Sequence, residues 1–359
     1  MKIAYVAQIS AKSRGVLKKI HGQIAAWEAM GHEVRYFFIS HEPVPGYTVY
    51  PFWKRYKILN PTFKLLCDLN KYQPDCIYMR EDGLPVSRFI RFLLWGKKTI
   101  LEINGNGDLE GKKYYYNSFP EKRNYWLNYA VNHFFYRFIA GIVCVSHELA
   151  TLPHIAACKQ TLVIPNSINF QDISIRKTNT SSSPIHVLFL GSQGQEWHGV
   201  DKIIHLAKQL DDKFIFHIVG PSPQDLQQYS PPQNVVIHGY KTHYEDIVKK
   251  CHIAIGSLAL HRKDMDEASP LKVREYLASG FPVLIGYTDT AFIEETPDFV
   301  FRIENTEYPF KNKEILSQIE AFFQKNAPRI VSRGEVEQYI DADIYEKKRI
   351  CFMKECLKK

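Results

Sequence analysis

The chain has 359 residues, a formal net charge of +8 and an ordinary globular composition, with 45% hydrophobic and 13% aromatic residues. This length predicts two domains with separate hydrophobic cores. The seven cysteines are scattered and odd in number, which argues against a disulfide framework or a zinc site. The sequence begins as a strand rather than a signal peptide, and no apolar run is long enough to span a bilayer, so we expect a cytoplasmic protein.

Positive charge is concentrated in the first half of the chain. Residues 1–170 contain 22 Lys and Arg against 12 Asp and Glu, whereas residues 171–359 contain 24 against 26. Two basic and aromatic stretches, 50–57 and 88–98, suit anionic lipid headgroups, although core helices whose Lys and Arg reach solvent explain them equally well. We therefore expect peripheral contact with the inner face of an anionic membrane. No nucleic-acid partner is expected, because no recognisable binding module accompanies the charge.

Short β-rich runs alternate with helical patterns along the whole chain. In the first half these runs lie at 3–6, 33–38, 76–79, 99–103, 142–145 and 162–164. In the second half they lie at 187–190, 214–219, 235–237, 253–255, 283–285 and 299–301. Apolar strands that do not alternate, separated by amphipathic helices, are typical of parallel sheets covered on both faces. We predict an α/β fold of two doubly wound, Rossmann-like domains that face each other across a cleft.

A polar segment divides the two sets of strands. Residues 166–184 are rich in Ser and Thr and are the best linker candidate in the sequence. We predict a first domain over 1–168, a linker over 169–184 and a second domain over 185–338. The apolar positions of the last segment, about 340–359, follow helical spacing, and we expect this helix to be able to pack back on the first domain.

Polar residues at the strand ends of the first half suit an acceptor site. Glu102 and Asn104 end one strand and Arg80 ends another, but a capped strand end and a local ion pair explain them as readily. Gly15 follows the first strand, where a glycine lets the backbone approach donor phosphates, although an ordinary tight turn is as good an explanation. The glycine run at 105–111 has one residue too many for a dinucleotide fingerprint, so no NAD cofactor is expected.

The most informative segment lies between Glu267 and Glu275. It has the pattern of a loop followed by a sharply started helix and then a strand. Ser269 suits the N-cap, Pro270 suits the first helical position and Gly280 suits a C-terminal stop. Two glutamates at this spacing often occur by chance, but with these three residues in register we favour a functional site.

The predicted helix start is an anion site. The backbone N–H groups of Leu271 and Lys272 have no partner within the helix, and an anion suits them. Glu267 lies just before this start, and Glu275 lies about one and a half turns inside the helix. An anion held between two carboxylates that bind hydroxyl groups suits a nucleotide sugar, with its diphosphate on the helix end.

At these residues the chain resembles the family 4 glycosyltransferases, which have the two-domain architecture called GT-B. The segment from Glu267 to Glu275 is similar to their E-x7-E motif. Residues 187–201 resemble the family's strand, donor-phosphate loop and helix, and 163–168 resemble its entry into the interdomain linker. The resemblance spans nearly the whole chain and is strongest in 186–290.

The resemblance implies retaining, metal-independent transfer of a hexose or related sugar from a UDP- or GDP-sugar to a hydroxyl group. A lipid-linked surface glycan is the expected acceptor. Glu275 would bind the ribose and Glu267 the transferred sugar, and Gly239 and Tyr240 would contact the nucleobase. The backbone around Ser269, Leu271 and Lys272 would meet the sugar and the diphosphate.

One part of the family pattern is missing. Family members commonly have an Arg after the glycine that ends the strand and a Lys before the next helix, where this chain has Ser192 and His198. We predict that Arg262 and Lys263 supply the missing positive charge and that His198 donates a hydrogen bond to phosphate or becomes charged beside it. The alternative is a catalytically inactive partner subunit of another glycosyltransferase.

Overall fold

The structure is a computed structural model that describes residues 1–10, 14–40, 42–51, 59–81, 98–107, 119–176 and 184–358. It divides into two compact units, Met1–Pro165 with Ala342–Lys359, and Asn166–Asp341. Most of the stretches at 50–57 and 88–98, the end of the glycine run at 105–111 and the linker residues 177–183 lie outside the described residues.

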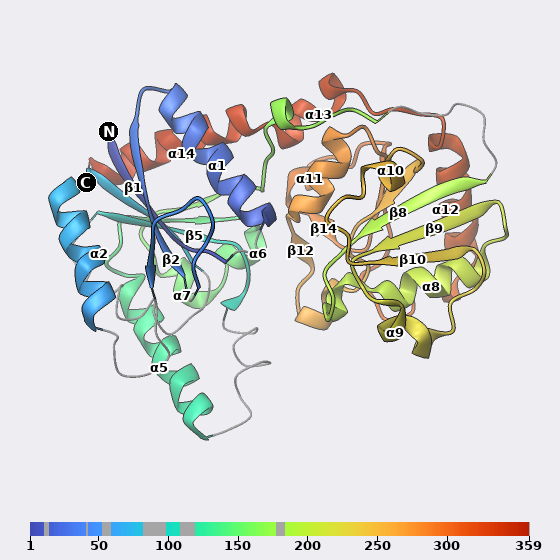
Figure 1. The fold of residues 1–359 in the computed structure, drawn as a ribbon, viewed down its shortest axis with the longest axis horizontal. Coiled ribbons are helices and arrows are strands. Elements are labelled where there is room, and N and C mark those ends of the chain that lie inside the picture. The colour runs from blue at the N-terminus through green and yellow to red at the C-terminus, as the bar shows by residue number, and fades with distance from the viewer. Residues whose placement is uncertain are drawn as a thin grey trace. The chain divides into compact units, whose positions relative to one another are not determined.

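The first unit, which carries β1, β2 and β5 in Figure 1, is built on a parallel sheet. Its strand order is β3-β2-β1-β4-β5-β6-β7. The strands are β1 (Lys2–Gln8), β2 (Glu33–Ser40), β3 (Val49–Pro51), β4 (Cys76–Arg80), β5 (Thr99–Ile103), β6 (Gly141–Cys144) and β7 (Thr161–Val163). The inner strands are buried along nearly their whole length, which explains why their sequences are apolar without alternation.

The helices of the first unit come from both ends of the chain. They are α1 (Arg14–Ala29), α2 (Leu59–Tyr72), α5 (Phe119–Phe135), α6 (His147–Ala150), α7 (Pro153–Ala156) and α14 (Ala342–Leu357). The indole N–H of Trp27 in α1 donates to Glu346 of α14 at 2.8 Å, and both side chains are buried. The C-terminal helix is therefore part of the first unit.

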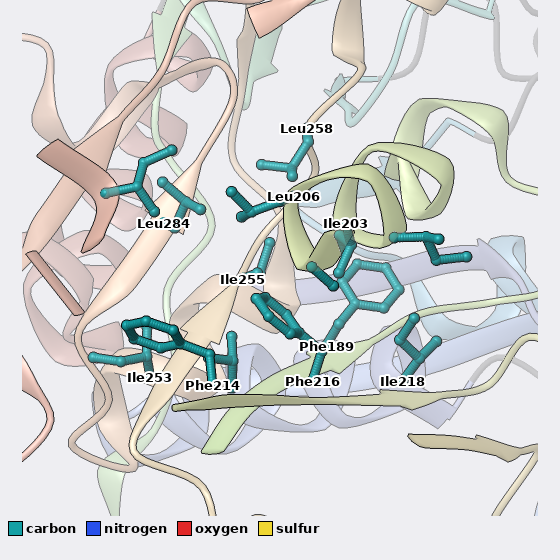
Figure 2. Packing of buried hydrophobic residues seen from close by; sticks show 14 of the residues in the cluster. Phe189, Ile203, Leu206, Phe214, Phe216, Ile218, Ile253, Ile255, Leu258 and Leu284 are labelled. Carbon is teal, nitrogen blue, oxygen red and sulfur yellow. The ribbon is translucent and has the colours of Figure 1, made fainter. Parts of the chain in front are cut away.

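The second unit has a six-stranded parallel sheet with the order β10-β9-β8-β11-β13-β15 and a separate parallel pair, β12 with β14. The strands are β8 (Ile185–Leu190), β9 (Phe214–Val219), β10 (Val235–Gly239), β11 (Ile253–Ile255), β12 (Glu267–Ala268), β13 (Val283–Ile285), β14 (Thr288–Asp289) and β15 (Val300–Arg302). Figure 2 shows the core of this unit, in which Phe189, Phe216 and Ile255 pack with Ile203 and Leu206.

Helices and short 3-10 turns connect these strands. The α-helices are α8 (Val200–Gln209), α9 (Pro223–Leu226), α10 (Glu245–Val248), α11 (Leu271–Ala278), α12 (Lys313–Asn326) and α13 (Arg333–Ile340). The 3-10 turns are η1 (Phe170–Asp172), η2 (Glu196–His198), η3 (Gln227–Tyr229), η4 (Leu260–Lys263), η5 (Thr290–Phe292) and η6 (Pro309–Lys311). In the part of the chain described, no helix combines the length and apolar character needed to cross a bilayer.

The prediction of two doubly wound, Rossmann-like units is confirmed. Each of the predicted strands is present with ends within two residues of the expected ones, whereas β3 and the pair β12–β14 were not predicted. The start of the predicted linker belongs to the second unit. The guanidinium of Arg176 is buried there and donates to the carbonyl oxygens of Gly280 and Cys251, each at 3.1 Å.

Candidate functional site

The first turn of α11 differs from the prediction. Its N-cap is Pro270, with extended backbone (φ −70°, ψ 135°), and no side chain caps the helix start. The prediction of Ser269 as the N-cap is wrong. The Ser269 hydroxyl instead accepts hydrogen bonds from the backbone N–H of Asn166 and from the guanidinium of Arg274, each at 2.7 Å. Gly280, at φ +87°, follows the helix as expected.

A buried ion pair holds α11 in place. The side chains of Arg274 and Asp289 are both 0% exposed, and Nη1 of Arg274 donates to Asp289 at 3.1 Å. Its Nε donates to the carbonyl oxygen of Asn166 at 2.7 Å. Such a pair is stable only when further hydrogen bonds offset desolvation, which these partners supply. The sequence analysis did not predict this pair. The only sign of it in the sequence is an arginine on the apolar face of the helix.

The helix start has a buried positive charge beside it. The Nζ atom of Lys272 is buried, lies 4.4 Å from the centre of the Phe189 ring and has no hydrogen-bond partner among the described residues. Burial lowers the pKa of Lys272 from 10.5 to about 7. A buried ammonium group without partners is costly, and oxygen atoms of an anion would relieve that cost. The uncapped N–H groups of Leu271 and Lys272 are at the same end of α11.

His198 belongs to the same cluster. Its ring contacts Phe189 edge-on, with 5.7 Å between centroids, and its Nδ1 atom is buried with no hydrogen-bond partner among the described residues. Burial, together with the nearby ammonium groups of Lys272 and Lys263, lowers its pKa to about 2. The imidazole is therefore neutral. A hydrogen bond to the backbone of Ser192 already engages the ring, so Nδ1 is the nitrogen left for a ligand. Lys263 lies over the ring of Trp197, with its Nζ 3.6 Å from the centroid.

The turn after β8 contains Gly191, which packs against a second glycine, Gly220. A Cβ atom on Gly191 would lie 2.5 Å from the Phe189 ring and 3.0 Å from Nδ1 of His198. A Cβ on Gly220, at φ +117°, would lie 1.7 Å from the carbonyl oxygen of Gly191. The backbone here is thus packed tightly beside His198, and the next residue, Ser192, is exposed.

Arg262, predicted to supply positive charge to the diphosphate, is paired with acidic residues. Its guanidinium donates to Asp201 at 2.9 and 2.7 Å, to Glu307 at 3.1 Å through Nε, and to the carbonyl oxygen of Glu196 at 3.1 Å. These carboxylates raise the pKa of Arg262, and Arg262 in turn lowers the pKa of Glu307 to about 2. We interpret Arg262 as a clamp between η4, α8 and Glu307, whereas Lys263 and Lys272 lie near His198.

The two glutamates of the motif lie on consecutive elements. Glu267 is in β12 and is buried, and Glu275 is half-buried on α11, about one turn after its first residue. Elsewhere in this unit, Gly239 ends β10 and Tyr240 follows it with its side chain 76% exposed. An exposed aromatic ring at a strand end suits stacking against a nucleobase.

The structure brings together the predicted acceptor residues, but inside the first unit. Glu102 is fully buried and accepts hydrogen bonds from Arg80 at 3.1 Å, Asn104 at 2.9 Å and Tyr78 at 2.6 Å, and from the Lys19 ammonium. Burial alone would raise the pKa of Glu102, but the surrounding cations hold it well below its ordinary range. We interpret this cluster as a structural network, of which only the outermost side chains are accessible to a ligand.

Gly15 is in the first turn of α1 and not in a loop after β1. A Cβ atom at this position would meet no atom of a described residue within 4 Å, so none of these residues requires a glycine here. In the described ranges no group of three or more His, Cys, Asp or Glu side chains has an arrangement that could hold a metal ion.

Comparison with known proteins covers the same region. Residues 184–307, which contain β8, the turn after it and α11, match the family described as Glycosyl transferases group 1. No curated protein matches the sequence.

Solved structures match over nearly the full length. Sucrose-phosphate synthase from Thermosynechococcus elongatus superposes with a TM-score of 0.70 at 14% identity, covering 99% of this chain and 98% of that one. Anabaena HepE in complex with UDP and glucose gives 0.67 at 15% identity, covering 99% of each chain. The chain has the GT-B fold. The lipopolysaccharide outer core galactosyltransferase WaaB shares this GT-B fold, with a TM-score of 0.65 at 11% identity and coverage of 99% of each chain.

Proposed function

We propose that this protein is a glycosyltransferase that moves a sugar from a nucleotide sugar to a hydroxyl group, and that its second unit holds the donor. The observation that carries the proposal is the buried Lys272 ammonium, which has no hydrogen-bond partner among the described residues. A diphosphate at the start of α11 would supply the oxygen atoms that this ammonium lacks. The match of residues 184–307 to Glycosyl transferases group 1 supports the same assignment.

The proposed chemistry is stabilisation of a leaving diphosphate. As the bond between the anomeric carbon and the phosphate oxygen breaks, negative charge develops on the diphosphate. Lys272 and the first N–H groups of α11 are fixed in place by packing, so they stabilise this charge without reorganising. His198 lines the site as a neutral ring, and Lys263 adds positive charge. This arrangement would replace the Arg and Lys that the family pattern places at Ser192 and His198.

The remaining donor contacts follow the motif. We assign the ribose hydroxyls to Glu275, the transferred sugar to Glu267 and the nucleobase to Tyr240. Transfer with retention at the anomeric carbon and without a metal ion is part of this proposal, as is a hexose as the transferred group. Because the HepE structure is a complex with UDP and glucose, a UDP-sugar is the first donor to test, followed by a GDP-sugar.

The proposed acceptor is a hydroxyl group of a lipid-linked surface glycan, bound by the basic first unit. Residues 1–170 carry an excess of positive charge, which favours contact with an anionic membrane where such an acceptor would reside. The protein would then work at the inner face of the membrane as a peripheral enzyme.

The test is a panel of UDP-, GDP- and ADP-sugars incubated with the protein and a membrane extract as acceptor. We expect one donor class to be consumed and the product to retain the donor's anomeric configuration. Lys272→Met should slow this turnover, and Lys311→Met should not. Lys311 is a matched control, because its ammonium also lies over an aromatic ring, 4.1 Å from the centre of Tyr308, but is exposed.

Absence of both binding and turnover across the panel would overturn the proposal. It would favour the alternative, a catalytically inactive GT-B partner subunit of another glycosyltransferase. Binding of a donor with slow hydrolysis in the absence of acceptor would favour the enzyme.

A further inference from the structure

The α5 helix of the first unit exposes large apolar side chains. Trp126, Leu127 and Phe134 are 56%, 48% and 52% exposed, and Phe138, just after the helix, is 53% exposed. At about 100° per residue, the three helical positions fall within roughly 100° of the helix circumference. Exposed large apolar side chains gathered on one helix face indicate an interaction surface.

The opposite side of α5 is anchored in the unit. The rings of Tyr129 and Tyr136 lie 6.4 and 5.6 Å from His154 of α7, and Phe135 is only 3% exposed. Within its unit, α5 extends away from the sheet in Figure 1. The helix therefore has a packed face and an apolar face turned to solvent.

Positive charge accompanies this apolar face. Lys122, Arg123 and Arg137 are exposed, and residues 119–138 contain a single acidic residue, Glu121. A helix with Trp and Phe on one face and Lys or Arg beside them is typical of segments that lie in a membrane interface. The rings enter the boundary between headgroups and acyl chains, and the cations meet lipid phosphates. Two copies packed through this face would bring their cations together, which disfavours self-association.

We propose that α5 docks on a bilayer that bears anionic lipids, with Trp126, Leu127, Phe134 and Phe138 in the interface and Arg123 and Arg137 on the headgroups. This inference rests on the proposed function and names the surface that makes its membrane contact. The residues of this surface are not those of the stretches at 50–57 and 88–98, from which the contact was first expected.

The test is sedimentation of the full chain with two kinds of vesicle, phosphatidylcholine alone and phosphatidylcholine with phosphatidylglycerol. We expect binding to the anionic vesicles only, weakened by salt. The double variant Trp126→Ser/Phe134→Ser should lower the partition coefficient by roughly tenfold or more, because burial of two aromatic side chains is lost. Arg123→Gln/Arg137→Gln should lower it and flatten its salt dependence. Tyr308→Ser is the control, since Tyr308 is 66% exposed in the second unit.

Each outcome decides the inference. Unchanged thermal midpoints with weaker binding in both double variants would support it. Equal binding by wild type and both double variants, or no binding to either vesicle, would overturn it. A dimer in solution that Trp126→Ser/Phe134→Ser dissolves would assign this face to a second copy and also overturn it. Titration of a UDP-sugar into the same proteins keeps the two proposals apart, because donor binding without vesicle binding rejects only the membrane surface.

Discussion

The Lys272 ammonium lies 4.4 Å from the centre of the Phe189 ring, in a place where it is buried and no described residue accepts a hydrogen bond from it. Phe189 is itself a core residue of the second unit, so the surface beneath the ammonium is rigid. A fixed, partly desolvated cation at the start of α11 is the basis of the proposed donor site.

Binding of a diphosphate should therefore be coupled to protonation of Lys272. Its pKa is about 7 in the unbound protein, so at pH 8 the amine is mostly neutral. A bound diphosphate favours the charged form and raises this pKa. We expect UDP binding at pH 8 to take up close to one proton, measured by calorimetry in buffers of different ionisation enthalpy. At pH 6, where the group is already charged, uptake by Lys272 should vanish; equal uptake in Lys272→Met would contradict the assignment.

Replacing Arg262 should lower the stability of the fold more than it lowers the affinity for the donor. Arg262→Ala removes hydrogen bonds to Asp201, Glu307 and the Glu196 carbonyl, and we expect the free energy of unfolding to fall by about 1–3 kcal/mol after solvent screening. Urea denaturation measures this loss. A stable Arg262→Ala protein that no longer binds UDP would restore Arg262 as the phosphate ligand that the sequence suggested.

We expect the two glutamates to bind different parts of the donor. Glu275→Gln should weaken binding of UDP and of UDP-sugar alike, by roughly tenfold or more, because the ribose is common to both. Glu267→Gln should weaken binding of UDP-sugar while leaving UDP nearly unchanged. Calorimetry with both ligands compares them directly. The assignment fails if Glu267→Gln lowers the affinity for UDP as much as Glu275→Gln does.

A row of histidines predicts a pH-dependent stability of the second unit. Nε2 of His217 lies 2.8 Å from His186, and its Nδ1 lies 3.0 Å from His238. Burial, then the neighbouring His186, His238 and Lys250, lower the pKa of His217 from 6.5 to about 4. The unfolded chain therefore binds more protons than the folded chain between these pH values, and stability falls as pH falls.

The expected loss from His217 is about 2–3 kcal/mol between pH 7 and pH 4. It is measured by urea denaturation at a series of pH values. His217→Phe should reduce the slope over this range, whereas His243→Asn should not, because His243 is exposed. An identical slope in wild type and His217→Phe would show that other groups control the acid sensitivity.

Much of the fold was predictable because its signals are local. Apolar runs of three to six residues between helical patterns predicted the strands of both sheets, and Gly280 marked the end of α11. The pair β12–β14 was missed because two residues on each side of a bridge form no pattern.

The features of the site that the sequence did not show depend on contacts between distant parts of the chain. Serine is a residue type that favours the N-cap. The Ser269 hydroxyl instead accepts a hydrogen bond from the backbone N–H of Asn166, which is 103 positions away. Arg262 was predicted to meet the diphosphate because the sequence does not show that it pairs with Asp201 and Glu307, which lie 61 and 45 positions away. For Lys272 the sequence indicated only a backbone contact, since the position of its ammonium depends on Phe189 in another strand.

The most direct test of the donor site is titration of UDP into the wild type, Lys272→Met and Lys311→Met at pH 6. At this pH Lys272 is charged, and loss of a charged hydrogen bond should lower the affinity of Lys272→Met by roughly 10- to 100-fold. Its thermal midpoint without ligand should stay equal or rise, because a buried ammonium without a partner has been removed. Equal UDP affinity in all three proteins would contradict the account.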